Sequence, residues 1–385
     1  MSLNAQILVL NAGSSSFKLG LFDATGEEQL AESQATWDVD ETVGRQAALR
    51  DLLADIDLTR VAAVGHRVVH GGARFTGAVR IDSEVRAEID ALASLAPLHN
   101  RAALEGIEAV GQLLPGVPQV AAFDTAVHAT LPPHAYLYAL PYAWYERWSI
   151  RRFGFHGLSH AYCAERAAEL LGRPLDEMKV VTCHLGSGCS LASIERGQSI
   201  ATTMGFTPLD GLMMATRPGS VDPGLLTFLL AHNLLTLPEL EEALYHQSGL
   251  KGVSGGSGDM REVLARRAAG DARAALAFDL YVTRLREEIA AMAASLGGID
   301  VLAFTGGVGE HASEVRAATC AAFAWIGLTL DDAANATVAP DTDIALAESS
   351  VRVLVLHTRE ELMVARETVR VLGGESAIAE IRNGA

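Results

Sequence analysis

The segment Ile7–Gly13, ILVLNAG, decides the fold of this chain because it joins a buried strand to a Gly/Ser turn. Three serines follow at 14–16, and Phe17–Phe22 then reads FKLGLF, a second apolar strand. Two apolar runs on either side of a short Gly-rich turn are typical of a β-hairpin. Backbone N–H groups and serine hydroxyls in such a turn can converge on phosphate oxygens, although a Ser-rich surface turn has the same pattern.

A second segment, VVTCHLGSGCSLASI at residues 180–194, has the same layout of strand, Gly/Ser turn and strand. Aligning Gly13 with Gly186 superposes NAGSSSFK on HLGSGCSL. Two such segments about half a chain apart indicate an internal duplication. Two unrelated turns remain the alternative, since Gly/Ser turns between strands are common.

Strands and helices alternate along the rest of the chain, which predicts an α/β architecture with mixed sheets. The length of 385 residues exceeds the roughly 250–300 at which a single core stops growing, so we expect two domains. The predicted boundaries are 1–124 plus 361–385 for the N-terminal domain and 125–360 for the C-terminal domain. Strands are predicted at 61–69, 118–123, 300–305 and 351–357, and helices at 100–113, 158–172, 224–233, 260–296 with a break at Gly270, and 360–372.

The net charge of −17 argues against nucleic acid as a partner, because a phosphate backbone requires a concentrated basic surface. The chain has no run of about 18 apolar residues that could span a membrane and no signal-peptide pattern, so we expect a cytoplasmic protein. The four cysteines form no CxxC pair and are expected to be buried, reduced thiols: Cys163, Cys183, Cys189 and Cys320.

Two further Gly-rich loops are candidates for ligand binding. Neither a P-loop nor a Rossmann fingerprint is present in the required context, which disfavours both nucleotide folds. The loop Phe304–Glu310, FTGGVGE, lies between a strand and a helix, where it could bind an anion or a nucleoside or only cap the strand. The loop Gly252–Asp259, GVSGGSGD, is so rich in glycine that we expect it to be flexible and to close over a ligand.

Several motifs in series resemble the acetate kinase family: NAGSSSFK (11–18), GHRVVHGG (65–72), LAPLHN (95–100), FDTAVH (123–128), LPYAWYERWSIRRFGFHGLSH (140–160), GFTPLDGLMMATRPGSVDP (205–223) and FTGGVGE (304–310). The resemblance runs in order through essentially the whole chain. It implies the acetate and sugar kinase, Hsp70 and actin fold, a ribonuclease H-like α/β fold with two similar domains and a central cleft. Each domain of that fold carries a phosphate hairpin.

The resemblance also implies a reaction and its components. ATP and acetate would give acetyl phosphate and ADP by reversible, direct in-line transfer, with propionate kinase or a kinase of broad short-chain range as the alternative. Mg²⁺, or Mn²⁺ in its place, would accompany the nucleotide, and the chain would form a homodimer. The C-terminal domain would contain the second phosphate loop, the nucleotide site and the dimer interface.

Carried over residue by residue, the resemblance implies four catalytic side chains, Arg67, Asp124, His156 and Arg217, of which His156 and Arg217 stabilise the transition state. Arg67 would also bind the substrate, whose methyl group would fit an apolar pocket of Val69, Leu98, Phe155 and Pro208. Asn11 and Glu360 would hold the metal region, together with Asp124. Three groups would bind ATP: Asn11, Ser14, Ser16 and Lys18; His184, Gly186, Ser187 and Gly188; and Asp259, Met260, Arg261, Gly307, Val308, Gly309 and His311.

The chain departs from the family pattern at a few positions. Ser187 and Cys189 stand where the second phosphate loop usually has Asn and Ser, and Met260 replaces a Phe. His311 and Arg359 each replace an Asn. These changes leave the nucleoside preference open, whereas the predicted type of reaction is unaffected.

The residue types suit the implied chemistry. A carboxylate is already ionised at neutral pH and needs no general base, whereas its approach to a γ-phosphoryl group is opposed by charge. Arginines, a lysine, a donating histidine and Mg²⁺ neutralise that charge as it spreads in the transition state.

Each candidate residue also has a structural alternative. Arg67 could pair with a surface carboxylate and Arg217 could anchor a loop, and His156 and His184 could be satisfied core histidines. The sequence Thr358–Glu361, TREE, fits a capping box with Glu361 as its acid, which would leave Glu360 to face Mg²⁺ through water.

Overall fold

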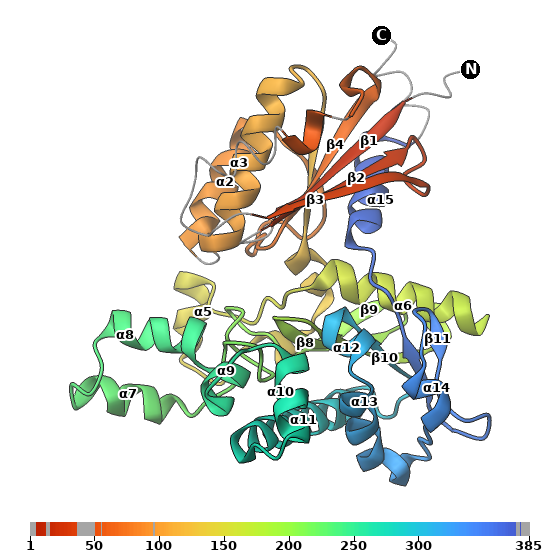
Figure 1. The fold of residues 1–385 in the computed structure, drawn as a ribbon. Coiled ribbons are helices and arrows are strands. Elements are labelled where there is room, and N and C mark those ends of the chain that lie inside the picture. Colours follow the sequence, from red (N-terminus) through yellow and green to blue (C-terminus); the bar gives the residue numbers. More distant parts are fainter. Residues whose placement is uncertain are drawn as a thin grey trace. The chain divides into compact units, whose positions relative to one another are not determined.

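The computed structural model describes residues 5–12, 16–36, 51–54, 56–94, 97–374 and 378, with the backbone alone for 16, 36, 94 and 97–99. The chain divides into two compact units: unit 1 comprises residues 1–129 and 359–385, and unit 2 comprises residues 130–358. The predicted boundaries at 124/125 and 360/361 lie a few residues from these. In Figure 1 the blue helix α15 (Glu360–Leu372) lies beside the red N-terminal strands, so unit 1 combines segments from both halves of the sequence.

Unit 1 contains a six-stranded sheet in the order β3-β2-β1-β4-β6-β5. Strands β1, β4 and β6 are parallel, whereas β2, β3 and β5 run antiparallel to their neighbours. Strand β1, QILVLNA, is buried at every position, as expected for a central strand that is covered on both faces. The strands are β1 (Gln6–Ala12), β2 (Ser16–Asp23), β3 (Gln29–Thr36), β4 (Val61–Val68), β5 (Val79–Arg80) and β6 (Gln119–Phe123).

Helices cover the two faces of this sheet. Helices α2 (Ser83–Ala91) and α3 (Pro97–Leu113) lie on one face and α15 on the other (Figure 1). Helix α15 packs against β1, β4 and β6. Gly65 on β4 permits this close approach, because a Cβ there would lie 2.7 Å from Val364 Cγ1.

The sheet of unit 2 repeats this arrangement, with the strand order β9-β8-β7-β10-β12-β11. Strands β7, β10 and β12 are parallel, and β8, β9 and β11 are antiparallel to their neighbours. The two sheets therefore share strand order, strand direction and order along the chain, which confirms the internal duplication. The strands are β7 (Lys179–Leu185), β8 (Cys189–Glu195), β9 (Gln198–Thr202), β10 (Val301–Thr305), β11 (Thr342–Asp343) and β12 (Arg352–Val355).

Helix α6 (Gly157–Leu171) packs against β7, β8 and β10, and α11 (Ala272–Ser295) packs against β7, β8 and β9. Figure 1 shows these helices on opposite faces of the second sheet. None of the helices in the described residues is long and apolar enough to cross a membrane. The remaining helices are α4 (Pro133–Tyr136), α5 (Tyr142–Trp148), α7 (Pro223–Ala231), α8 (Leu237–Glu242), α9 (Gly249–Ser254), α10 (Met260–Ala268), α12 (Gly306–His311), α13 (Ser313–Cys320) and α14 (Asp332–Ala336); short 3₁₀ or π segments are Leu58–Arg60, Leu92–Ser94, Asp124–Thr130, Leu175–Glu177, Ala243–Gln247 and Ala321–Ile326.

The predicted two-domain α/β fold is confirmed, and the predicted strands and helices all occur within a few residues of their expected bounds. Gly270 breaks the long helical segment as predicted, with φ of +89°. The four cysteines are buried and free, also as predicted.

Two local predictions are wrong. The segment 252–259 is not one flexible loop, because Gly252–Ser254 end α9, and Arg273 donates to the carbonyls of Gly252 and Val253. The capping box is absent as well: α15 starts after Arg359, which makes no side-chain cap hydrogen bond. In both places a tertiary contact replaces the expected local one. The carbonyls of Gly252 and Val253 accept hydrogen bonds from Arg273, and the carboxylate of Glu361 accepts one from Asn11.

Candidate active site

In unit 1, a polar cluster forms where parallel strands end. Asn11 lies near the end of β1 beside Arg67 on β4, and Asp124 follows directly after β6. The carboxyl ends of parallel strands lie at one edge of a sheet, so the topology brings these side chains together. The start of α15 adds Glu360 to the same cluster.

Arg67 is the centre of this cluster. Its Nε and Nη2 donate to the two carboxylate oxygens of Asp124 at 3.0 and 2.7 Å, a bidentate pair. Its Nη1 lies 2.7 Å from Glu360 Oε2 and 3.1 Å from Asn11 Oδ1. Burial alone would lower the pKa of Arg67, but the charges of Asp124 and Glu360 raise it above its usual value. Arg67 therefore does pair with carboxylates, as the structural alternative supposed, although Asp124 is buried rather than at the surface.

Glu361 is a member of this cluster that the sequence analysis assigned to a cap. Asn11 Nδ2 donates to Glu361 Oε1 at 2.8 Å and to Glu360 Oε2 at 3.3 Å. The amide of Asn11 is thus oriented, with its oxygen toward Arg67 and its nitrogen toward the two acids. No pattern in the sequence pointed to this contact, because it joins residues 350 positions apart.

In unit 2, histidines gather around the second hairpin. His156 has a left-handed backbone, with φ of +55°, at the position that precedes α6. Its Nδ1 lies 2.8 Å from Ser190 Oγ on β8. The ring of His184, near the end of β7, stacks on that of His156 with centroids 4.3 Å apart, and its Nδ1 lies 2.8 Å from Ser159 Oγ. Ser159 and Ser190 are partners that the sequence analysis missed, because a serine in a turn or helix has no distinctive pattern.

Arg217 lies beside these histidines. Its Nη1 donates to the carbonyl of Pro208 at 2.7 Å, so it holds a loop as the structural alternative supposed. A Cβ added to Gly188 would lie 2.7 Å from Arg217 Nη2 and 3.4 Å from His156 Nε2. Burial lowers the pKa of Arg217, although a guanidinium stays charged. The structure thus brings His156, His184, Arg217 and the Gly188 turn together.

The remaining candidates for the acetate site and the first hairpin are divided between the units. Val69 is buried in unit 1 and Phe155 in unit 2, where Pro208 is half-buried. Lys18 is exposed on β2, paired in register with Asn11. Ser14 lies outside the described residues, and the side chains of Ser16 and Leu98 are likewise not described.

The nucleotide candidates of unit 2 lie on three elements. Gly307, Val308, Gly309 and His311 form most of α12, which begins directly at the end of β10. Asp259 accepts a hydrogen bond from the backbone of Arg261 as the N-cap of α10 and pairs with its guanidinium. Bonding to Arg261 lowers the pKa of Asp259. Met260 is buried, whereas Ser187 is exposed in the β7–β8 turn next to half-buried Gly186.

Oxygen donors of the kind that Mg²⁺ prefers surround Arg67: the carboxylates of Asp124 and Glu360 and the amide of Asn11. Within the described ranges, no group of three or more His, Cys, Asp or Glu side chains is placed to hold a metal by itself. The donor set therefore fits Mg²⁺ bound through one or two protein oxygens, with water and phosphate oxygens as the other ligands.

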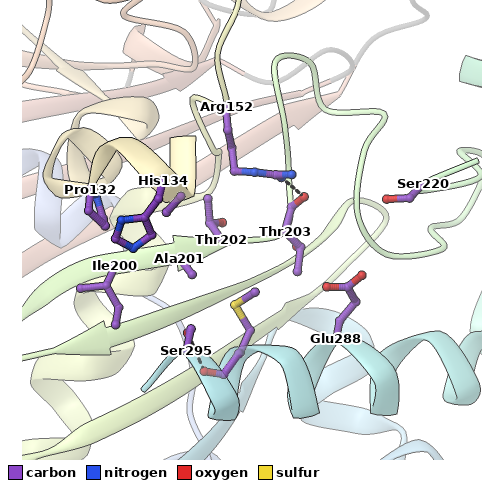
Figure 2. A pocket seen from close by; sticks show the side chains of 12 residues that line it. Pro132, His134, Arg152, Ile200, Ala201, Thr202, Thr203, Ser220, Glu288 and Ser295 are labelled. Carbon is purple, nitrogen blue, oxygen red and sulfur yellow. Dashed lines mark hydrogen bonds between the residues drawn. The ribbon is translucent and has the colours of Figure 1, made fainter. Parts of the chain in front are cut away.

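A separate cavity of about 460 Å³ lies along the edge strand β9 of unit 2 (Figure 2). Glu288 and Ser295 on α11 face the strand across it, and the guanidinium of Arg152 donates to the carbonyls of Thr203 and Met204. None of the predicted site residues lines this cavity. The cavity is therefore distinct from the histidine cluster.

A duplicated α/β fold with a Gly/Ser hairpin in each unit, and with arginine and histidine side chains at the strand ends, defines a phosphotransferase for anionic substrates. Residues 26–366 match the model of the acetokinase family. The chain belongs to this family and is a kinase.

Individual relatives agree over nearly the whole chain. An acetate kinase of Nostoc punctiforme is 46% identical, covering 95% of this chain and 99% of the relative. The crystal structure of Porphyromonas gingivalis acetate kinase is 39% identical with a TM-score of 0.87, covering 96% of this chain and 100% of that one. A propionate kinase from Francisella tularensis has the same TM-score at 36% identity, covering 95% of this chain and 100% of that one.

Proposed function

We propose that this chain catalyses reversible phosphoryl transfer between ATP and acetate, giving acetyl phosphate and ADP. The observation that carries the proposal is the grouping of Arg217, His156 and His184 against the Gly188 turn, where a guanidinium and two imidazole rings lie close together. Charge neutralisation is what transfer to a carboxylate requires, because two anionic reactants must meet. The names of the relatives favour acetate as the acceptor.

In unit 1, Arg67 binds the substrate carboxylate, and Asp124 fixes the orientation of the Arg67 guanidinium. A bidentate carboxylate partner holds a guanidinium in one plane, so Arg67 is pre-organised before substrate arrives. Asn11 and Glu360 hold Mg²⁺, for which Mn²⁺ can substitute, with Asp124 close by. Bound there, Mg²⁺ would supply charge neutralisation for the phosphate groups.

In unit 2, His156 and Arg217 stabilise the charge that develops on the transferred group. Arg217 is restrained by Pro208, and a restrained guanidinium loses little entropy when it binds an anion. The nucleotide is bound by His184, by the turn Gly186–Gly188 and by residues of α12 and the start of α10. Asn11, Ser14, Ser16 and Lys18 bind phosphate from the first hairpin in unit 1.

Substrate size is set by Val69, Leu98, Phe155 and Pro208. One methylene in an apolar pocket changes selectivity by only about 1–3 kcal/mol, so propionate remains the second candidate, in keeping with the propionate kinase among the solved relatives. Val69→Ala should raise kcat/KM for propionate relative to acetate by about 10-fold. An unchanged ratio would remove Val69 from the pocket.

Hydroxylamine trapping tests the whole proposal. With ATP, Mg²⁺ and acetate, an acyl phosphate forms a coloured hydroxamate, whereas a bare ATPase releases phosphate without it. The signal should disappear with EDTA, because metal charge is required. Phosphate release without hydroxamate would overturn the proposal.

We also propose that two copies form a homodimer through unit 2. Helix α7, PGLLTFLLA, has no buried residue, and Leu225, Phe228, Leu234 and Leu237 on and after it are about half exposed or more. An apolar surface of this kind marks an interface rather than a solvated face. Phe228→Glu should give monomers in size-exclusion chromatography with light scattering, whereas Leu276→Glu, an equally exposed leucine on α11, should not. A monomeric wild type would contradict the dimer.

Unit 2 would then contain the second phosphate loop, the nucleotide site and the dimer interface. We place the protein in the cytoplasm. Its four cysteines are buried and free, which suits a reducing compartment.

A further inference from the structure

A chain of hydrogen bonds runs inward from His156 through three buried side chains of unit 2. Ser190 Oγ lies 2.8 Å from His156 Nδ1 and 2.8 Å from His160 Nε2. His160 Nδ1 lies 2.7 Å from Thr182 Oγ1 on β7. Thr182, His160 and Ser190 are each 0% exposed. The buried polar groups of the chain must therefore satisfy one another.

Two directions are possible for this hydrogen-bonded relay if the Ser190 proton is used within it. Ser190 has one hydroxyl proton and two ring nitrogens as neighbours, so in each direction it donates to one nitrogen and accepts from the other. The Thr182 hydroxyl is also 3.4 Å from the carbonyl of Ala192, which can only accept. If Thr182 donates to that carbonyl, it accepts from His160 Nδ1–H. Ser190 then donates to His160 Nε2 and accepts from His156 Nδ1–H.

The reverse direction leaves the Ala192 carbonyl without the Thr182 proton and places the proton of neutral His156 on Nε2. The two directions differ when His156 becomes an imidazolium. In the first, Nε2 gains a proton while every bond of the chain is kept. In the second, Nδ1–H would face the hydroxyl proton of Ser190, so the chain would have to reverse. Both directions can present a donor to an anion, but only the first keeps the Thr182–Ala192 hydrogen bond, and it keeps every bond of the relay once His156 is an imidazolium.

We propose that Thr182, His160 and Ser190 are positioning residues that hold neutral His156 as its Nδ1–H tautomer and present Nε2 to the transferred phosphoryl group. The inference rests on the proposed role of His156 and adds three residues that the family resemblance did not assign. The geometry agrees, because Nε2 is the ring nitrogen that would lie 3.4 Å from a Cβ at Gly188, next to Arg217.

Three titratable or charged side chains of unit 2 are among the described neighbours of His156. The ring of His184 stacks on it from β7, His160 on α6 reaches it through Ser190, and Arg217 lies beyond Gly188. Among them Arg217 is permanently cationic. The phosphoryl group brings the opposing negative charge. His156 Nε2 then takes a proton from solvent, and the imidazolium donates it in a hydrogen bond to a phosphoryl oxygen.

Nitrogen-15 NMR of the full-length enzyme with labelled histidines tests the tautomer directly. Long-range proton–nitrogen correlations separate Nδ1–H from Nε2–H rings, and His156→Ala identifies the signals of residue 156. We expect the Nδ1–H pattern in the ligand-free enzyme at a pH where histidines are neutral. An Nε2–H pattern would overturn the relay, even if His156→Ala abolishes activity and so supports the proposed function.

Variants add a kinetic readout. Ser190→Ala should lose the Nδ1–H preference and lower kcat about 10–100-fold, as loss of an orienting partner does, with KM for ATP nearly unchanged. Ser190→Thr keeps the hydroxyl and should restore both. The matched control is Ser193→Ala: Ser193 is an equally buried serine of β8, and its hydroxyl donates to the Met292 carbonyl instead.

The outcomes separate the two proposals. A Ser190→Ala enzyme that keeps the Nδ1–H signature would overturn the relay whatever its kcat. Equal losses in the Ser190→Ala and Ser193→Ala enzymes would do the same, because they would show a general effect of cutting β8. An active His156→Ala enzyme would remove the role of His156, and with it the purpose of the relay.

Discussion

Unit 1 and unit 2 share one strand order but carry different chemistry at matching positions of their sheets. Asn11 lies beside Arg67 in unit 1, and the same register places His184 beside Thr305 in unit 2. The position across each hairpin is a lysine, Lys18, in unit 1 and a serine, Ser190, in unit 2. The duplicated backbone thus fixes where side chains meet, whereas the residue types decide between a cluster of ion pairs in unit 1 and a cluster of hydrogen-bonded histidines and serines in unit 2.

The largest expected effect comes from removing the charge at the centre of unit 1. Arg67→Met leaves the carboxylates of Asp124 and Glu360 without their cation. We expect kcat to fall by a factor on the order of 10³. The free energy of unfolding of unit 1 should fall by about 3–5 kcal/mol, because an unpaired buried charge remains. Kinetics of hydroxamate formation and urea unfolding measure the two losses.

Arg74 offers a matched control within unit 1. It also pairs with two carboxylates, Glu84 and Glu88, but all three side chains are well exposed. Arg74→Met should leave both activity and stability nearly unchanged, since water replaces the lost contacts. Similar losses in the two variants would mean that burial does not distinguish the clusters.

The second expected effect tests a cation of unit 2. Arg217→Lys keeps a positive charge but loses the planar fork. We expect kcat to fall about 10²–10³ with a modest rise in KM for ATP, since the contact strengthens as charge develops. Circular dichroism and thermal melting should change little. Near-normal kcat with a melting temperature several degrees lower would make Arg217 only the anchor of the Pro208 loop.

The third prediction concerns His66 in unit 1, whose matching position in unit 2 is Phe304. Burial lowers the pKa of His66 from 6.5 to about 4, although its hydrogen bond to Gln119 acts in the opposite direction. The unfolded chain therefore binds the proton first, and stability falls as pH drops from about 6.5 towards 4. Between pH 8 and pH 5 the loss should be about 2 kcal/mol.

Urea unfolding of wild type and His66→Phe at both pH values measures this term. Phenylalanine makes unit 1 like unit 2 at this position and cannot take up a proton. The variant should lose about 2 kcal/mol less than wild type on acidification. Equal losses in both proteins would assign the acid sensitivity to other groups.

The smallest expected effect is at Thr305, the position in unit 2 that matches Arg67. Its buried hydroxyl has no hydrogen-bond partner among the described residues. Thr305→Val should leave the free energy of unfolding unchanged or raise it by up to about 1 kcal/mol, and kcat should stay within about twofold. A large loss of kcat would show that this hydroxyl contacts a bound substrate.

Local patterns in the sequence were enough to predict the repeated hairpins and the helices α3, α6, α7, α10, α11 and α15, but not the shorter helices between them. Strand–turn–strand segments with glycine in the turn depend on neighbouring residues, so the two hairpins could be recognised before the sheets were known. Gly270 is a similar case, since its position after a helix predicts a left-handed backbone.

Contacts between distant residues could not be predicted in this way. The acids Glu360 and Glu361 are adjacent in the sequence, and a local rule assigned the second to a cap that the fold does not use. Asn11 competes for that carboxylate from the other end of the chain. Ser190 likewise acquires two histidine partners only once α6 lies on the second sheet.

The placement of α15 in unit 1 has a consequence for synthesis of the chain. Residues 130–358 are contiguous, so unit 2 has all of its elements before the last helix leaves the ribosome. Unit 1 has its six strands from the first third of the chain, but one face of β1, β4 and β6 stays uncovered until residues 360–372 emerge. The first unit to be translated is therefore the last to complete its core. If translation stalls before α15 is made, an apolar face of the sheet in unit 1 stays exposed to solvent.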